Sequence, residues 1–289
     1  MIVSASYRTD IPAFYGAWFL ERLRRGSCRV VNPYGGPDYE VALTPEVADG
    51  FVFWTRNAKP FLAALEETAA RGIPFVVQYT ITGYPREIEP SVVPAEQAAT
   101  LVRELSGRYG RRAVVWRYDP VFLTSLTPPD WHLRRFAELA TALAGATDEV
   151  VLSFAQIYAK TRVNSDNAAR RHGFAWSDPE PEAKIELLGR LAARARDRGL
   201  APSLCSQPEL SSPGLAAARC IDAARLSDVA GRPIAAPTKG NRPGCLCAQS
   251  RDIGAYDTCP HGCVYCYAVR RPEVAKARHR AHDHTSPVL

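Results

Sequence analysis

Phe51-Val52-Phe53-Trp54 is a short apolar run that ends directly in the polar residues Thr55-Arg56-Asn57. An apolar run of this length, bounded by polar residues, is typical of a strand that is buried on both faces of a sheet. Residues 61–71 follow and are rich in good helix formers. The stretch therefore predicts a strand, a polar loop and a helix, and repetition of this unit sets the fold.

The same unit recurs along the chain. We expect further strands at residues 2–6, 75–80, 113–116, 150–154 and 200–205, and helices at residues 14–25, 94–109, 131–144 and 181–198. About six strands alternating with helices indicate an α/β fold with a parallel sheet, which right-handed crossovers would curl into a partial or full parallel (β/α) barrel.

The chain changes character after the last expected strand. Residues 1–207 form the expected barrel, and residues 208–289 form a cysteine-rich metal-binding segment that we expect to fold over the barrel mouth. Residues 30–41 contain a Gly-Gly-Pro-Asp turn between short extended pieces and predict an inserted excursion. A short helix is expected at residues 217–226, and a frayed helix or tail at residues 270–289.

Polar residues collect where the expected strands end. Parallel strands end at one rim of a barrel, where active sites lie, so these residues are expected to share a site. They are Arg8, Asp10, Arg56, Asn57, Gln78, Tyr79, Arg117, Asp119, Gln156 and Cys205. An arginine-rich mouth suits a carboxylate or phosphate group. The structural alternative is that Arg8 pairs with Asp10, and Arg117 with Asp119, as ion pairs tying loops to the rim. Trp54, Tyr79, Trp116 and Tyr118 are expected to be packing residues.

Three cysteines near the end of the chain have the spacing C-x3-C-x2-C: Cys259, Cys263 and Cys266, with Tyr265 just before the last. Pro260 and Gly262 allow the backbone to fold back, so the three thiols can converge on one metal centre. Three ligands leave one iron of a cubane cluster without a protein ligand. A zinc site that also uses His261 is the main alternative. A disulfide framework fits badly, because 289 residues can bury a core without staples.

Four other cysteines form a second set: Cys205, Cys220, Cys245 and Cys247. Four thiols are enough for a closed cluster or for a structural zinc ion. The alternative is that Cys205 and Cys220 are ordinary small buried residues. Cys28 stands apart and is expected to be a packing residue.

Composition limits the class of protein. With 46% hydrophobic and 23% charged residues and no long apolar run, the sequence predicts a globular chain without a membrane span. The N-terminus lacks the pattern of a secretory signal, so we expect a cytoplasmic protein. The formal charge of +6 permits an anionic substrate or nucleic acid but is too small and dispersed to argue for either.

Several motifs resemble a bacterial family of uncharacterised proteins that is catalogued as a domain of unknown function. The motifs are Ser6-x-Arg8-Thr-Asp-Ile-Pro-Ala13, Phe53-Trp-Thr-Arg-Asn57, Trp116-Arg-Tyr-Asp-Pro120, Cys245-x-Cys247, Asp252-Ile-Gly-Ala-Tyr256 and the Cys259–Tyr267 stretch. The C-terminal cysteines of that family have been likened to the cluster motif of radical S-adenosylmethionine (SAM) enzymes. The resemblance implies a fold and a cofactor class, and no particular reaction.

Two features depart from ordinary radical SAM enzymes. Their cluster loop follows the first strand, whereas here that loop holds Arg8-Thr9-Asp10 and the cysteines come last. The Gly-Gly-Glu stretch that holds the SAM amino group is replaced by Thr55-Arg56-Asn57.

These observations lead to one main hypothesis, an iron–sulfur, radical SAM-like enzyme of unknown substrate. Its cofactors would be a 4Fe-4S cluster, with a second cluster or zinc at the second cysteine set, and SAM. Arg8, Asp10, Arg117 and Asp119 are the expected catalytic contacts, and Arg56, Asn57, Gln78 and Tyr265 the expected cofactor contacts. The substrate would be a small or anionic molecule, and the electron donor a protein such as ferredoxin or flavodoxin.

Two alternatives remain open at this point. One is a non-catalytic zinc or iron–sulfur module that binds nucleic acid or a protein partner. The other is a barrel hydrolase or lyase that uses Asp10 or Asp119 as a general base.

Overall fold

Eight parallel strands form the centre of the computed structural model, which describes residues 1–33 and 35–289. From edge to edge the order is β11 (Ala216–Ala217), β10 (Ala201–Leu204), β8 (Glu149–Phe154), β6 (Val114–Val121), β5 (Phe75–Thr80), β4 (Gly50–Thr55), β1 (Ile2–Ala5) and β12 (Ser250–Asp252). Each neighbouring pair runs parallel. The six strands expected from the sequence are therefore confirmed within a few residues, in the expected α/β class.

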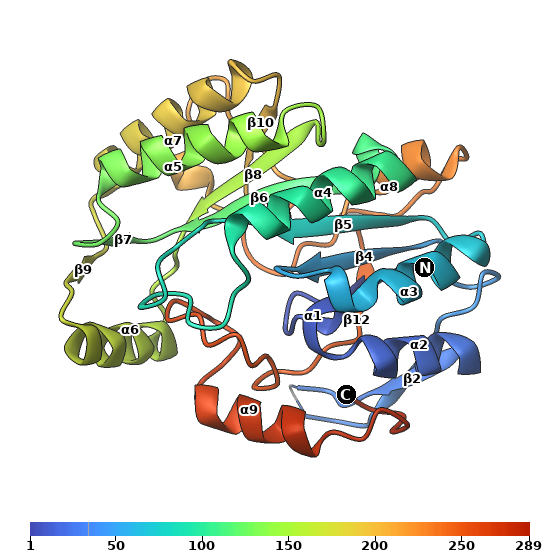
Figure 1. Ribbon diagram of the computed structural model, residues 1–289. Helices are drawn as coiled ribbons and strands as arrows, with labels where there is room; N and C mark the ends of the chain where they lie inside the picture. The colour runs from blue at the N-terminus through green and yellow to red at the C-terminus, as the bar shows by residue number, and fades with distance from the viewer. Residues whose placement is uncertain (34) are drawn as a thin grey trace.

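The sheet is open, so the expectation of a full barrel is wrong (Figure 1). Within residues 1–33 and 35–289 the edge strands β11 and β12 pair with β10 and β1 and not with each other. Both edge strands are two or three residues long. Closure of a barrel needs continuous, staggered pairing around the whole sheet.

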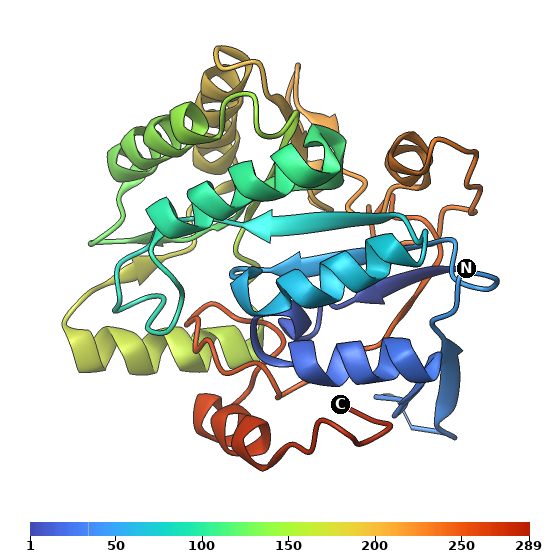
Figure 2. The same cartoon turned by 45° about the vertical axis from the view of Figure 1, so that its right-hand side comes forward.

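Helices cover one face of the sheet. They are α2 (Gly16–Arg25), α3 (Leu62–Ala70), α4 (Ala95–Tyr109), α5 (Pro129–Leu143) and α7 (Pro181–Arg196), and Figures 1 and 2 show them side by side along that face. Alternate strand residues, such as Phe51 and Phe53 in β4, point into the main core beneath these helices. The helices match the expected ones because their apolar stripes bury against this face.

The opposite, inner face is covered by residues 218–249, which include α8 (Ala223–Ala230). Ile221 and Leu226 from this segment pack with Val52, Val76 and Val115 of the strands. The helix expected at residues 217–226 begins later, because the side chain of Asp222 caps the new helix by accepting from the N–H of Ala224. Ala217 instead pairs with β10.

Other elements extend this frame. They are α1 (Ile11–Phe14), α6 (Ala159–His172), α9 (Pro272–Ala281), the antiparallel pair β2 (Ser27–Val30) and β3 (Tyr39–Ala42), the antiparallel pair β7 (Leu123–Thr124) and β9 (Trp176–Ser177), and three 3-10 turns at Lys59–Phe61, Arg111–Ala113 and Pro208–Leu210. Pairing of β2 with β3 confirms the predicted excursion, in which Tyr34 lies outside the described residues.

The end of the chain is packed on its beginning. Arg22 and Trp18 of α2 donate to the carbonyl oxygens of Thr285 and Ser286, and the N–H of Arg29 donates to the carbonyl of Pro287. The last residues are thus a helix followed by an anchored segment. None of the described helices has the length and apolar composition needed to cross a bilayer.

Candidate functional site

The polar residues that follow the strands lie at the carboxyl edge of the sheet and divide into two groups. Asp10 and Arg56, after β1 and β4, contact the C-terminal cysteine loop. Gln78 and Arg117, in β5 and β6, point to the inner face and contact Cys220. The single rim site expected from the sequence is therefore two sites.

The first site surrounds Cys259, Cys263 and Cys266, which we call the tail triad. The three thiols are partly exposed and close enough for their charges to act on one another. A hydrogen bond from the N–H of Cys266 to the carbonyl of Cys263 closes the turn at 3.1 Å. Gly262 has a φ of +77°, which favours glycine, so the loop can fold back as its sequence predicts.

Backbone N–H groups point at the sulfur atoms of the tail triad. The N–H of Ala268 lies 3.3 Å from Cys266 Sγ. The N–H groups of Asp10 and His261 lie near Cys259 and partly oppose the rise in its pKa. Burial and the nearby charge of Asp10 raise the pKa of Cys259 to about 12. Burial also raises the pKa of Cys266. These thiols are therefore protonated at neutral pH unless a positive centre replaces the proton.

Asp10 joins three segments at the tail triad. Its Oδ1 accepts from the N–H of Ala13 at 2.9 Å, which caps α1. Its Oδ2 accepts from the N–H of Arg56 at 2.8 Å and lies 2.8 Å from His261 Nε2. The other nitrogen of His261 lies 3.4 Å from the carbonyl of Ser91. Asp10 is thus a positioning residue whose oxygens are already used, and both nitrogens of His261 have oxygen partners.

A buried polar network holds the other side of the loop. Arg56 donates to Glu89 Oε1 at 2.6 Å and to the hydroxyl of Tyr265 at 2.6 Å. Tyr265 in turn donates to Glu89, and Thr82 donates to the same carboxylate at 2.8 Å. Glu89 was missed by sequence reasoning, because it stands in a proline-rich loop with no motif around it.

Two expected contacts lie elsewhere. The Oδ1 of Asn57 accepts from the N–H of Lys59 at 3.1 Å, so Asn57 stabilises a turn. Arg8 does not form the ion pair with Asp10 that the structural alternative described; its Nε lies 3.8 Å from Asp252 instead. Arg8 therefore belongs to a network that anchors the tail.

Asp252, in β12, is the centre of that network. Its carboxylate accepts from the hydroxyls of Ser4 and Ser6 at 2.8 and 2.7 Å and from the N–H of Gly254 at 3.0 Å. Burial raises the pKa of Asp252. The Asp252-Ile-Gly-Ala motif was the available signal for this residue, which the strand pattern alone did not reveal.

The second site surrounds Cys205, Cys220, Cys245 and Cys247, which we call the inner group. Cys205 and Cys220 have their sulfur atoms 3.5 Å apart. Cys247 lies near enough to Cys220, and Cys245 near enough to Cys247, for the charge of one thiol to raise the pKa of the next. Three of them are buried and Cys245 is partly exposed. The structure thus brings together four cysteines that come from three separate segments.

Cations border the inner group. Arg117 Nη1 lies 3.0 Å from Cys220 Sγ, and Arg242 Nη2 lies 3.4 Å from Cys205 Sγ. Arg117 also pairs with Asp119, as the structural alternative expected, and Ser153 donates to the same carboxylate. Gln78 bridges the group, because it donates to the carbonyl of Cys220 and accepts from Arg117.

The packing residues are placed as expected. Tyr79, Trp116 and Tyr118 are fully buried, and Cys28 is buried in the main core. Trp54 is partly buried and lies under the guanidinium of Arg117, 4.9 Å from its ring centre.

Among the pockets formed by the described residues, one of about 770 Å³ lies between α6 and the start of α9. Lys160, Arg270, Arg271 and Glu273 are among the residues that line it. Lys160 Nζ lies 5.3 Å from the ring centre of Tyr256 and is near enough to Cys266 for its charge to oppose the rise in the pKa of that thiol. This basic pocket therefore adjoins the tail triad.

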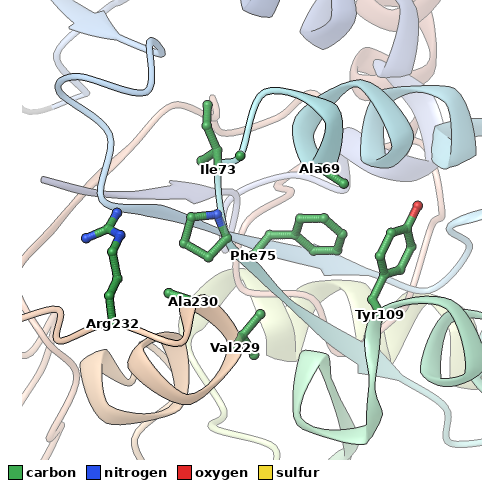
Figure 3. A pocket seen from close by; sticks show the side chains of 9 residues that line it. Ala69, Ile73, Phe75, Tyr109, Val229, Ala230 and Arg232 are labelled. Atoms are coloured by element: carbon green, nitrogen blue, oxygen red, sulfur yellow. The ribbon is translucent and has the colours of Figure 1, made fainter.

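A second pocket, of about 270 Å³, lies at the amino end of β5, on the far side from the cysteines. Figure 3 shows the rings of Phe75 and Tyr109 together on one side and Arg232 on the other. Most of its lining residues are apolar, and none of the residues expected at a site is among them.

Within the part of the chain that the structure describes, no three or more His, Cys, Asp or Glu side chains stand ready as the ligands of one metal ion. In the inner group, the sulfurs of Cys205 and Cys220 contact each other. A cluster would not require the three sulfurs of the tail triad to surround a single ion, because each cysteine ligand of a cluster binds a separate iron atom.

Comparison with known proteins gives one match. Neither the curated proteins nor the solved structures contain a significant match to the chain. One family model, described as a domain of unknown function (DUF1848), matches residues 2–268. That match spans nearly the whole chain, both cysteine groups included, and the protein therefore belongs to the DUF1848 family.

Proposed function

We propose that the protein is an iron–sulfur enzyme of the radical SAM type, in which the tail triad holds a 4Fe-4S cluster. The observation that carries the proposal is the placement of three thiols from one short loop at the carboxyl edge of a parallel sheet. Active sites of parallel α/β folds lie at this edge.

The surroundings of the tail triad fit such a group. Backbone N–H groups contact Cys259 and Cys266, and the charge of Arg56 favours the thiolate of Cys263. Hydrogen bonds and charge around the sulfurs are what a protein uses to hold and tune a cluster. When bound by these three cysteines, a cluster would leave one iron without a protein ligand for SAM and would supply the electron for reductive SAM cleavage.

The protein's own residues position this loop. Asp10 ties it to β1 and β4, and the network of Arg56, Glu89 and Tyr265 fixes the loop between Cys263 and Cys266. Glu89 is 2% exposed, so the network also excludes water from that side. Arg8 acts at a distance by holding Asp252, and Arg117 and Asp119 belong to the inner group.

The basic pocket between α6 and α9 indicates the substrate class. Lys160, Arg270 and Arg271 line it beside the tail triad, so an anionic substrate, such as a carboxylate or phosphate ester, suits it. An acidic electron donor of the ferredoxin or flavodoxin kind would be steered to the same basic surface.

Reductive SAM cleavage tests the proposal. The protein is purified without oxygen, loaded with iron and sulfide, reduced with dithionite and incubated with SAM. We expect methionine and 5′-deoxyadenosine from the wild type and from Cys28→Ser, which removes a buried thiol outside both groups. Cys263→Ser should form neither product. Iron-loaded wild-type protein that leaves SAM intact would refute the proposal.

A further inference from the structure

We propose that the inner group binds a single tetrahedral metal ion of the zinc class, and that this ion fastens residues 218–249 to the inner face of the sheet. This inference does not depend on the function proposed for the tail triad. It rests on the spacing of the sulfurs, their hydrogen-bond donors and the segments that they join.

The spacing favours one ion over a cluster. Metal–sulfur bonds of about 2.3 Å place the sulfurs of a tetrahedral zinc site about 3.8 Å apart. Cys205 and Cys220 have their sulfurs 3.5 Å apart. Cys247 and Cys245 lie near enough for the charge of Cys247 to act on Cys220 and that of Cys245 to act on Cys247. Ligands of a cubane bind separate iron atoms and therefore lie farther apart.

Each sulfur of the inner group has a donor suited to a thiolate. Arg117 contacts Cys220, Arg242 contacts Cys205, and the N–H of Ile221 lies 3.4 Å from Cys247 Sγ. Cys245 is approached by the N–H groups of Cys247 and Asn241. Donors of this kind around metal-bound sulfur are the usual second layer of a thiolate site.

The charges also fit. A divalent ion displaces the remaining thiol protons to solvent and leaves a complex with four thiolates and a net charge of about −2. The guanidinium groups of Arg117 and Arg242 lie against this complex. Asp119 is paired with Arg117 and is also hydrogen-bonded by Ser153, so its charge is already matched.

Ligation requires the four sulfurs to move to positions around one ion. Rotation about χ1 moves a cysteine sulfur without moving the backbone. The loop that carries Cys245 is built for close approach: a Cβ on Gly240 would lie 2.2 Å from the carbonyl oxygen of Cys245, and Gly244 has a φ of +71°. Both glycines let this loop curl over the inner group.

The position of the group gives the ion its role. Cys205 follows β10, Cys220 precedes α8, and Cys245 and Cys247 precede β12. One ion would join the sheet to both ends of the segment that covers its inner face. Four protein ligands leave no position for a substrate, which is the mark of a structural site.

Metal analysis and X-ray absorption at the zinc edge test this inference on the full-length protein produced with zinc in the medium. We expect about one zinc per chain with four sulfur neighbours at about 2.3 Å. Cys220→Ser should lower the zinc content at least tenfold, whereas Cys28→Ser and Cys263→Ser should keep it.

Cobalt substitution of the wild type provides a readout that needs no variant. Intense sulfur-to-cobalt charge-transfer bands with tetrahedral ligand-field bands are expected. Zinc that is absent, that has nitrogen or oxygen neighbours, or that stays bound in Cys220→Ser would overturn the inference. Iron and sulfide that persist in Cys263→Ser and are lost in Cys220→Ser would show a cluster at the inner group instead.

Discussion

The two cysteine groups differ in how the chain builds them. The tail triad comes from one eight-residue loop, is partly exposed and adjoins a basic pocket. The inner group comes from three segments, is mostly buried and is bordered by two arginines. A partly exposed group of three ligands can bind an added molecule at a fourth position, as catalysis requires. A group of four protein ligands leaves no such position and suits a structural role.

The existence of two cysteine groups also explains why the polar residues at the strand ends do not form one site. Residues at the strand ends contact both cysteine groups. Asp10 and Arg56 contact the loop of the tail triad, whereas Arg117 and Gln78 contact the inner group. Most of these side chains are already paired with other protein groups. We infer that they position the two groups and that the substrate binds nearer the pocket of Lys160.

The largest expected effect comes from Cys263→Ser. Loss of one tail-triad thiol should lower bound iron and SAM cleavage by more than about 100-fold, because ligand loss exceeds the effect of losing an outer partner. Zinc at the inner group should not change. Parallel iron, zinc and turnover measurements on Cys28→Ser serve as the control, and loss of both metals from Cys263→Ser would mean that the groups are not independent.

Glu89→Gln should give the next largest effect. The change keeps the shape but leaves Arg56 buried without its 2.6 Å carboxylate partner. We expect a fall of about 3–5 kcal/mol in the free energy of unfolding. We also expect a lower iron content at the tail triad and an unchanged zinc content. Denaturant unfolding measures the first effect.

Glu96→Gln is the matched control for Glu89→Gln. Glu96 pairs with Arg135 at 3.0 Å but its side chain is 73% exposed. Its loss should change the free energy of unfolding by less than about 1 kcal/mol. Equal destabilisation by the two substitutions would contradict the role given to the buried network.

Gly254→Ala should have a smaller effect that is confined to the tail. A Cβ at this position would lie 2.0 Å from Ser6 Oγ and 2.5 Å from Ser6 Cβ, so the contact between β1 and the tail must loosen. We expect a loss of about 1–3 kcal/mol of stability and reduced iron with unchanged zinc.

Gly107→Ala provides the comparison, because Gly107 is helical and a Cβ there meets nothing within 4 Å. That variant should be more stable by about 0.5–1 kcal/mol. Thermal unfolding of the two variants side by side distinguishes the close approach at Gly254 from a general effect of removing glycine.

The main strands and most of the helices could be predicted from the sequence, but the short edge strand and one polar helix could not. Apolar runs such as Phe51–Trp54 identified all six main strands, because burial on both faces leaves a continuous signal. The short edge strand β12 was invisible, since Ser250-Arg-Asp252 has no apolar pattern. The helix α6 was missed for a related reason: only Thr161 and Ser165 of its residues are buried, so it lacks an apolar stripe.

The candidate sites show the same limit. The tail triad is contiguous, so its spacing could be read directly, whereas Glu89 and Asp252 become partners of the site only through folding. Arg8 shows why the alternative of an Arg8–Asp10 ion pair failed: Asp10 is close to Arg8 in the sequence, but Asp252 is its ion-pair partner in the fold. The spacing of residues along the chain can therefore identify a site that lies within one loop. Contacts between residues on different strands can be identified only from the fold.

The most direct test counts iron, sulfide and zinc in anaerobically purified wild-type protein and in Cys263→Ser. We expect about four irons with matching sulfide and about one zinc per chain in the wild type, and zinc alone in the variant. About eight irons without zinc in the wild type, or iron that persists in Cys263→Ser, would contradict the assignment of a cluster to one group and a single ion to the other.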